Sequence, residues 1–146
     1  MDTTVQLLLD ERDITKVCHR YATALDTKDW PLLRSCFLPD AVAVYEGIGE
    51  CPGYDAIEAL CQSALGPLTR TQHLVGNVDV VVEGRAATAQ CYLQAQHVRE
   101  GVGGGDLFII AGRYSDELVR TDGGWRFARR TLATWWTDGN PAVVGR

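Results

Sequence analysis

Basic residues are scarce in this sequence, and they do not cluster. Lys16 and Lys28 are the only lysines among the 146 residues, and the formal net charge is −5. Because binding to a phosphate backbone requires a concentrated positive field, this charge balance argues against a nucleic-acid partner. Long apolar runs are also absent: none reaches the roughly 18 residues of a membrane span, and the N-terminus lacks a signal-peptide layout. The sequence therefore predicts a cytoplasmic protein that binds neither nucleic acid nor membranes.

The cysteines do not form a recognisable metal or disulfide pattern. Their number is odd and no CxxC spacing occurs; they are Cys18, Cys36, Cys51, Cys61 and Cys91. Disulfide frameworks and zinc sites normally show paired cysteines at short spacings. These residues are therefore predicted to be reduced, small members of the core, and neither a metal nor a cofactor is expected.

Length and composition indicate one globular domain over residues 1–146. The apolar share is 46% and the charged share 23%, as in a chain that folds around a core. Hydrophobic periodicity and turn signals place helices first and strands afterwards. Three helices are expected: one from about residue 3 or 10 to Asp26, a short one that begins after Asp29, and one over 53–67. The expected strands cover 41–47, 70–84, 85–100, 106–121 and 124–136, and a turn is expected at Pro39–Asp40.

This order of elements predicts an α+β fold. Tight turns at 83–85 and 122–124 would join the four later strands into two long hairpins. Helices followed by such an antiparallel meander would cover one face of a curved sheet. The segment GVGGGD (101–106) lies between two strands and lacks the helix that a phosphate-binding loop requires, so it is interpreted as a hairpin loop.

The stretch RYATALD (20–26) raises the question of what Asp26 does. Apolar residues recur before it at helical spacing, which predicts an amphipathic helix. Asp26 lies at the edge of that apolar stripe near the helix C-terminus, where the helix dipole slightly disfavours a carboxylate. It could simply start the following turn, as aspartate often does, or it could belong to a functional site.

Strand alternation sorts the residues around two histidines, His73 and His97, by face. A histidine that ends a row of small apolar residues, as His97 does, suits the wall of a pocket. On the first strand, one predicted face carries His73, Val75 and Asn77, and the opposite face carries Leu74, Val78, Val80 and Val82. On the second strand, His97 shares its predicted face with Ala89, Cys91, Leu93 and Ala95.

The order of motifs resembles the SnoaL-like branch of the nuclear-transport-factor-2-like (NTF2-like) superfamily over about residues 8–137. The matching segments are RYATALDTKDW, CFLPDAV, GYDAIEAL, TQHLVGNVDV and GRYSDELVRTDGGWRFARR. Members are similar cone-shaped α+β barrels, in which three helices and a bent, mostly antiparallel sheet enclose one deep pocket. The resemblance implies this fold, a small hydrophobic substrate and a homodimer or homotrimer. It leaves the reaction open, because the superfamily contains dehydratases, isomerases, cyclases, dehydrochlorinases and binding proteins.

The resemblance also implies site residues. Scytalone dehydratase and hexachlorocyclohexane dehydrochlorinase are similar in pairing an aspartate at a helix end with a strand histidine, and Asp26 and His73 match these positions. Tyr21 matches a tyrosine of bile-acid 7α-dehydratase, and His97 a second strand histidine of scytalone dehydratase. Arg130, or less closely Arg129, matches a strand arginine of the dehydrochlorinase and the bile-acid enzyme. The set is a hybrid, so none of these reactions transfers intact.

These residue types would suffice to eliminate water beside a carbonyl. Histidine, with an unperturbed pKa of ~6.5, can remove a carbon-bound proton and protonate a leaving oxygen. A carboxylate beside the imidazole would fix its tautomer, and a tyrosine or arginine could hold the developing enolate. In this hypothesis Asp26 orients His73 as general base. His97 or Tyr21 donates a proton to the departing hydroxyl, and Arg130 lines the pocket.

Each candidate also has a purely structural interpretation. His73 and His97 could be ordinary strand histidines, and Tyr21 could be a core aromatic residue with a satisfied hydroxyl. Arg129 and Arg130 point to opposite faces of their strand, so one of the two is expected to be a surface charge.

The sequence thus predicts a cofactor-independent lyase, most simply a dehydratase of a small hydroxy-ketone with a polycyclic, aromatic or steroid-like skeleton. Tyr45, Trp135 and Trp136 could line the pocket for such a flat substrate, although core packing is the ordinary role of each. One alternative is an isomerase or polyketide-type cyclase that uses the same histidine base. Another is a binding protein for small molecules that performs no chemistry.

Overall fold

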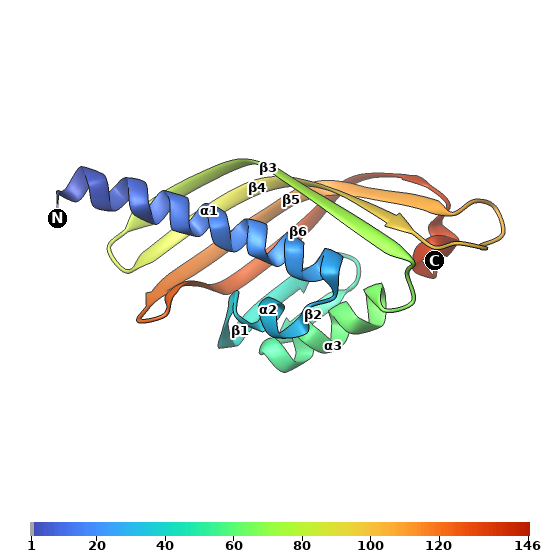
Figure 1. Cartoon of the computed structure of the whole chain (residues 1–146), viewed down its shortest axis with the longest axis horizontal. Helices are drawn as coiled ribbons and strands as arrows, with labels where there is room; N and C mark the ends of the chain where they lie inside the picture. Colours follow the sequence, from blue (N-terminus) through green and yellow to red (C-terminus); the bar gives the residue numbers. More distant parts are fainter. Residues whose placement is uncertain (1) are drawn as a thin grey trace.

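Three helices cover one face of a curved six-stranded sheet in the computed structural model, which describes residues 2–146 (Figure 1). The helices are α1 (Thr3–Thr27), α2 (Trp30–Arg34) and α3 (Tyr54–Leu65). The strands are β1 (Phe37–Tyr45), β2 (Gly49–Pro52), β3 (Arg70–Glu83), β4 (Ala86–Val98), β5 (Leu107–Thr121) and β6 (Gly124–Gly139), followed by the 3₁₀ turn η1 (Pro141–Val144). The predicted order of helices and long hairpins is confirmed.

The sheet is mixed and open. Its strand order is β2-β1-β6-β5-β4-β3, and all neighbours are antiparallel except β1 and β6, which run parallel. Figure 1 shows α1 running along the sheet, with α2 and α3 grouped near β1 and β2. The predicted cone-shaped α+β fold is confirmed, but β2 and β3 are edges and the sheet does not close into a barrel.

Both ends of α1 are fixed by polar contacts. The Asp2 carboxylate caps the N-terminus by accepting from backbone N–H groups of the first turn. At the other end, Lys28 adopts a left-handed φ of 52°, which is unfavourable for a residue with a Cβ. Its Nζ donates to the carbonyls of Gly66 and Leu68 at 3.2 and 2.9 Å, which ties the end of α1 to the connection between α3 and β3. Neither α1 nor any other described helix is apolar enough over a sufficient length to cross a membrane.

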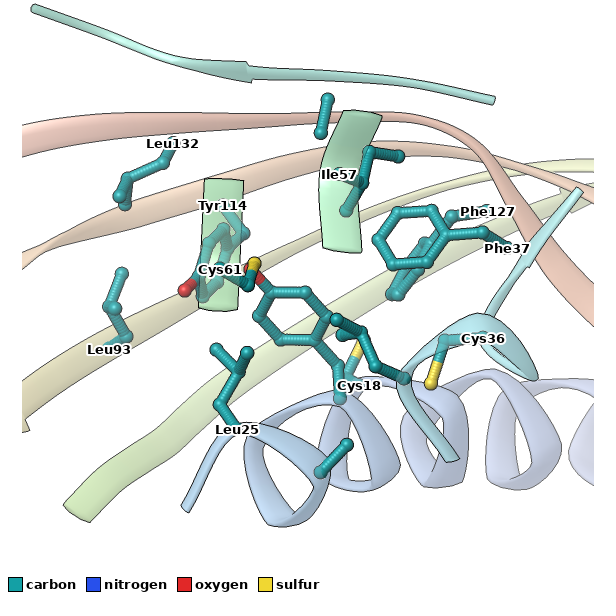
Figure 2. Close-up of a cluster of buried hydrophobic side chains, with 14 of the residues drawn as sticks. Cys18, Leu25, Cys36, Phe37, Ile57, Cys61, Leu93, Tyr114, Phe127 and Leu132 are labelled. Atoms are coloured by element: carbon teal, nitrogen blue, oxygen red, sulfur yellow. The ribbon is translucent and has the colours of Figure 1, made fainter. Parts of the chain in front are cut away.

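The core lies between α1, α3 and the inner face of the sheet. Figure 2 shows Leu25 from α1, Cys61 from α3 and Tyr114 from β5 pointing into one interior, together with Leu93 and Leu132. The buried stripe of α1 has the predicted helical spacing and comprises Ile14, Val17, Cys18, Tyr21, Ala24 and Leu25.

The region around β1 differs from the prediction. Pro39 and Asp40, expected to form a turn, lie within β1 and are exposed. The pairing of β1 with β6 is irregular between Phe37 and Val42, so a proline removes no regular ladder bond at this point. The four-residue strand β2 was not predicted, and β6 continues to Gly139 rather than ending near residue 136.

A bulge in β3 changes which side chains face the core. Asn77 adopts a φ of 52°, and the register between β3 and β4 shifts around it. Val78 therefore shares the inner face with His73, whereas the prediction grouped it with Leu74. Leu74 instead lies on the outer face, where it is 61% exposed. The inward residues of β3 are Thr71, His73, Val75, Val78, Val80 and Val82.

Candidate active site

A cavity of about 90 Å³ lies in the core where α1 and α3 face the sheet. Two histidines, His73 and His97, and three tyrosines, Tyr21, Tyr45 and Tyr114, form part of its wall. The rest of the wall is aliphatic apart from one cysteine, so a few polar groups stand in apolar surroundings, as is typical of ligand sites. A wider depression of about 350 Å³ shares His97 and part of the apolar wall with the cavity and forms its mouth.

Asp26 binds β3 through three hydrogen bonds. Its Oδ1 lies 2.6 Å from Nδ1 of His73 and accepts from the Thr71 hydroxyl at 3.0 Å, while Oδ2 accepts from the backbone N–H of His73 at 2.9 Å. Partial burial raises the pKa of Asp26, but the hydrogen bonds from His73 and Thr71 outweigh it and hold the pKa below its ordinary value. Because an ionised carboxylate only accepts, the neutral His73 ring carries its hydrogen on Nδ1 and has a free acceptor at Nε2.

His97 has the same tautomer but a different environment. It is 6% exposed, and its Nδ1 lies 3.2 Å from the Phe108 carbonyl, so the neutral ring again carries its hydrogen on Nδ1. Burial, assisted by the neighbouring His73 ring at a centroid distance of 6.1 Å, lowers the pKa of His97 to about 4. At neutral pH His97 therefore offers an acceptor at Nε2. It is poorly suited to the proton-donor role predicted for it.

Acid is expected to destabilise the fold through His97. The pKa of a histidine in the unfolded chain is ~6.5, so the unfolded chain binds a proton below that pH. The native state does not bind this proton until the pH falls to about 4, and stability is therefore lost between these two values. Between about pH 7.5 and 4.5, urea unfolding should show a loss of stability roughly 2–3 kcal/mol larger in the wild type than in His97→Gln. An equal loss in His97→Gln and wild type would contradict this assignment.

Two of the cavity tyrosines form a hydrogen-bonded pair, in which one hydroxyl donates to the other. The hydroxyl oxygens of Tyr21 and Tyr45 are 2.8 Å apart, and that of Tyr45 lies 3.7 Å from Sγ of Cys61. Burial raises the pKa values of Tyr21, Tyr45 and Tyr114 above their ordinary range, so all three phenols remain protonated at neutral pH. Protonated phenols in an apolar wall can donate to an oxygen of a bound ligand.

Arg130 lies behind the cavity wall and not in the cavity. Its guanidinium carbon is 4.3 Å from the Tyr21 ring centroid and 3.8 Å from that of Tyr114, and the side chain is fully buried. Its Nε and Nη2 donate to the two carboxylate oxygens of Asp116 at 2.8 and 3.0 Å. Burial lowers the pKa of Arg130, but Asp116 raises it more strongly, and the side chain stays charged. The predicted pocket position is thus corrected: Arg130 supports two wall tyrosines, while Arg129 is the surface charge.

Trp135 and Trp136 lie outside the cavity, contrary to prediction. They are 53% and 47% exposed, and the Trp135 ring packs against Tyr92 on the outer face at a centroid distance of 5.3 Å. A bulge in β6 opposite Gly112 inserts an extra residue and interrupts the alternation of faces. The two backbones approach so closely here that a Cβ on Gly112 would lie 1.9 Å from the Ala133 carbonyl oxygen.

Sequence reasoning missed three residues around this site: Thr71, Tyr114 and Asp116. Thr71 lies two residues before His73 and therefore shares its strand face, which period-2 alternation could have shown. Tyr114 and Asp116 share the inner face of β5 with apolar residues such as Ile110 and Leu118. An aspartate at an inward position of a predicted strand was the available signal for a buried ion pair.

Proteins related to this chain in sequence and fold are known. A family model for the SnoaL-like domain matches residues 6–131. The terrestric acid biosynthesis cluster protein E of Penicillium crustosum is 36% identical over 145 residues, which cover 94% of this chain and 92% of that protein. A crystal structure from Novosphingobium aromaticivorans, provisionally assigned as a scytalone dehydratase, is 26% identical with a TM-score of 0.85 and coverages of 94% and 92%. A hexachlorocyclohexane dehydrochlorinase from Novosphingobium barchaimii shares the fold, at 19% identity, a TM-score of 0.83 and 94% coverage of each chain.

Proposed function

The chain belongs to the SnoaL-like family, and we propose that it is a cofactor-independent lyase that dehydrates a small hydroxy-ketone. The family, the biosynthesis-cluster relative and the dehydratase-like structure support an enzymatic role of the lyase or isomerase type. The observation that carries the finer proposal is the contact between Asp26 and His73. An ionised carboxylate orients the His73 imidazole in the wall of an apolar cavity, and Nε2 of the Nδ1–H tautomer is free to act as a base.

In the proposed reaction, Nε2 of His73 takes a proton from the carbon beside the substrate's carbonyl. The electrons of that C–H bond pass into the carbonyl, and the resulting enolate accepts a hydrogen bond from the Tyr21–Tyr45 pair, in which one phenol donates to the other and the second keeps its O–H for the ligand. The C–O bond to the hydroxyl then breaks. Protonated His73 returns its proton to the departing hydroxide, so the products are an enone and water. His97, an acceptor at Nε2, holds the substrate's hydroxyl hydrogen before this step.

The size of the cavity supports a single-ring substrate. Its volume of about 90 Å³ is well below the roughly 300 Å³ at which sites for drug-sized ligands begin. A single ring in the cavity, with any further substituent in the mouth, suits this space better than a steroid or another polycyclic skeleton.

An isomerase is the second candidate, and the state of His97 favours keeping it. With its pKa lowered to about 4, His97 cannot supply an independent acid for a leaving group at neutral pH. If the substrate has no leaving group beside the acidic carbon, the same base and phenols would move a proton from one carbon to another.

Product analysis separates these possibilities. The whole chain would be incubated with a panel of single-ring β-hydroxy-ketones, with ultraviolet absorbance and mass spectrometry as readouts. A dehydratase produces an enone band and a product lighter by one water, whereas an isomerase conserves mass. Binding of these ketones without turnover would overturn the lyase proposal and favour the binding-protein alternative.

A second copy of the chain is proposed to cover the outer face of the sheet, giving a homodimer or homotrimer. Leu74, Tyr92 and Trp135 are each about half exposed or more there, and the Arg113 guanidinium lies 5.6 Å from the Trp135 ring centroid. Aromatic residues and arginine are the types enriched at the centres of protein interfaces.

Trp135→Glu is expected to convert this oligomer to a monomer, because it places a charge at the centre of the buried patch. Size-exclusion chromatography with light scattering would give the mass at several protein concentrations. Leu8→Glu, at a residue of α1 that is 62% exposed, is the matched control and should leave the mass unchanged. A wild type that remains monomeric at micromolar concentration would rule the interface out.

A further inference from the structure

Two cysteines from distant parts of the chain meet behind the cavity wall. Cys18 lies on α1, where Figure 2 labels it among the buried side chains, and Cys91 lies on β4; both are fully buried. Their Sγ atoms and a carboxylate oxygen of Asp116 all lie within 4.8 Å of one another. The two thiols are therefore close enough for chemistry that joins α1 to β4.

The charges around this cluster oppose a metal ion. Both carboxylate oxygens of Asp116 already accept from Arg130, and Nη2 of Arg130 lies 3.8 Å from Sγ of Cys91. A buried positive charge beside the sulfur repels a cation, and the cluster provides three ligands where a structural zinc site needs four. The same charge favours a thiolate.

The two thiols differ in how readily they ionise. A hydrogen bond from the Cys18 thiol and the charge of Arg130 lower the pKa of Cys91 despite its burial. The same hydrogen bond, together with burial, raises the pKa of Cys18. Because Nη2 of Arg130 lies 3.8 Å from its sulfur, Cys91 is the better placed of the two to carry a negative charge and attack, which leaves Cys18 as the resolving thiol.

We propose that Cys18 and Cys91 are a redox modification site that forms a reversible disulfide with hydrogen peroxide as oxidant. The cluster also offers a hydrogen-bond donor to an oxygen atom, because Nη1 of Arg130 is buried without a partner among the described residues. This inference does not rest on the proposed lyase activity.

The oxidation balances in two steps. The Cys91 thiolate attacks one peroxide oxygen, the O–O bond breaks, and the released hydroxide takes up the proton lost from Cys91 to become water. The sulfur of Cys18 then attacks the Cys91 sulfenic acid; the S–O bond breaks, the S–S bond forms, and a second water leaves with the Cys18 proton. Two thiols lose two electrons, and peroxide is reduced to two waters. A dithiol such as dithiothreitol reverses the change.

The test is peptide mapping of the full chain after treatment with peroxide. Before alkylation, the oxidised chain should have a mass lower by two hydrogen atoms. Denaturation and alkylation should then reveal two fewer reactive thiols, and digestion should yield a cross-linked peptide containing Cys18 and Cys91. Because the bond closes a long loop, Tm should rise by about 5–15 °C and return to its original value with dithiothreitol. Wild-type protein that keeps all five alkylatable thiols, or a disulfide mapped to another pair, would overturn the proposal.

Variants identify the two roles separately. Cys18→Ala should leave Cys91 as a sulfenic acid that dimedone traps, and Cys91→Ala should abolish both the disulfide and the adduct at these positions. Cys36→Ala, at another fully buried cysteine outside the cluster, is the matched control and should oxidise like the wild type. Equal dimedone labelling of the wild type and Cys18→Ala would show that Cys18 does not react with the Cys91 sulfenic acid, and this result would contradict the proposal.

Discussion

Asp26→Asn is expected to lower turnover by about 10²- to 10⁴-fold while the chain remains folded. The reason lies in the two atoms that the carboxylate faces on His73. Oδ2 accepts from a backbone N–H, which is always a donor, whereas Oδ1 faces Nδ1, which can be a donor or an acceptor. An asparagine satisfies both by turning its oxygen to the backbone and its NH₂ to Nδ1. The His73 ring then carries its hydrogen on Nε2, so this nitrogen can no longer accept a proton from the substrate.

Two measurements test this prediction on the same variant. Nitrogen-15 chemical shifts of the His73 ring should report hydrogen on Nδ1 in the wild type and on Nε2 in Asp26→Asn. Turnover of the substrate found by product analysis should fall in parallel, and His73→Gln should cause a loss of similar size. Asp29→Asn is the matched control, because Asp29 only caps α2 through the Leu32 N–H and asparagine is an equally good cap.

The outcomes distinguish three roles for Asp26. A reversed tautomer with lost turnover supports the positioning of a base. A reversed tautomer with unchanged turnover would mean that His73 is not the base, and the lyase proposal would fall with it. An unchanged tautomer with reduced stability would leave Asp26 as a clamp between α1 and β3, with the three hydrogen bonds serving the fold alone.

The position of Asp26 illustrates what the sequence could predict. A carboxylate at the edge of an apolar stripe needs a partner, and helical periodicity located that edge correctly. The strand face predicted for His97 on β4 is also correct, because that strand alternates without interruption from Ala87 to His97. Both successes rest on local periodicity, which depends only on the backbone geometry of one element.

The wrong predictions of strand faces come from bulges, which add one residue to a strand and so exchange its two faces. The extra residue at Asn77 placed Val78 on the face opposite to the predicted one, and the bulge beside Gly112 placed Trp136 on the outer face, opposite Ala111. An asparagine tolerates the left-handed conformation better than most residues, but a single Asn in a strand does not fix a bulge. Periodicity therefore remains reliable only up to the first irregularity in a strand.

The partner of Arg130 was hidden for the same reason. The hairpin turn pairs Thr121 with Gly124, and extending that register would place Asp116 opposite the exposed Arg129. A bulge between Glu117 and Leu118 shifts the register by one residue, so Asp116 lies opposite Arg130 instead. An expected surface pair thus becomes a buried one, and no local pattern in the sequence distinguishes the two registers.

This buried pair leads to the second large effect: Asp116→Asn is expected to lower the free energy of unfolding by about 3–5 kcal/mol. The substitution preserves shape but removes the negative charge that compensates Arg130, whose side chain is fully buried against three aromatic rings. An unpaired guanidinium in such surroundings cannot regain the hydration it loses on folding. Urea or thermal unfolding of the variant at neutral pH measures the loss.

Two comparisons separate the charge from the packing. Asp13→Asn breaks the exposed pair with Arg12, whose side chains are 45% and 57% exposed, and should change stability by less than about 1 kcal/mol. The double variant Asp116→Leu with Arg130→Met removes both buried charges together and should recover most of the loss, since well-packed apolar replacements of buried pairs are often neutral. If the double variant were as unstable as Asp116→Asn, the loss would come from packing around Tyr21 and Tyr114 and not from the uncompensated charge.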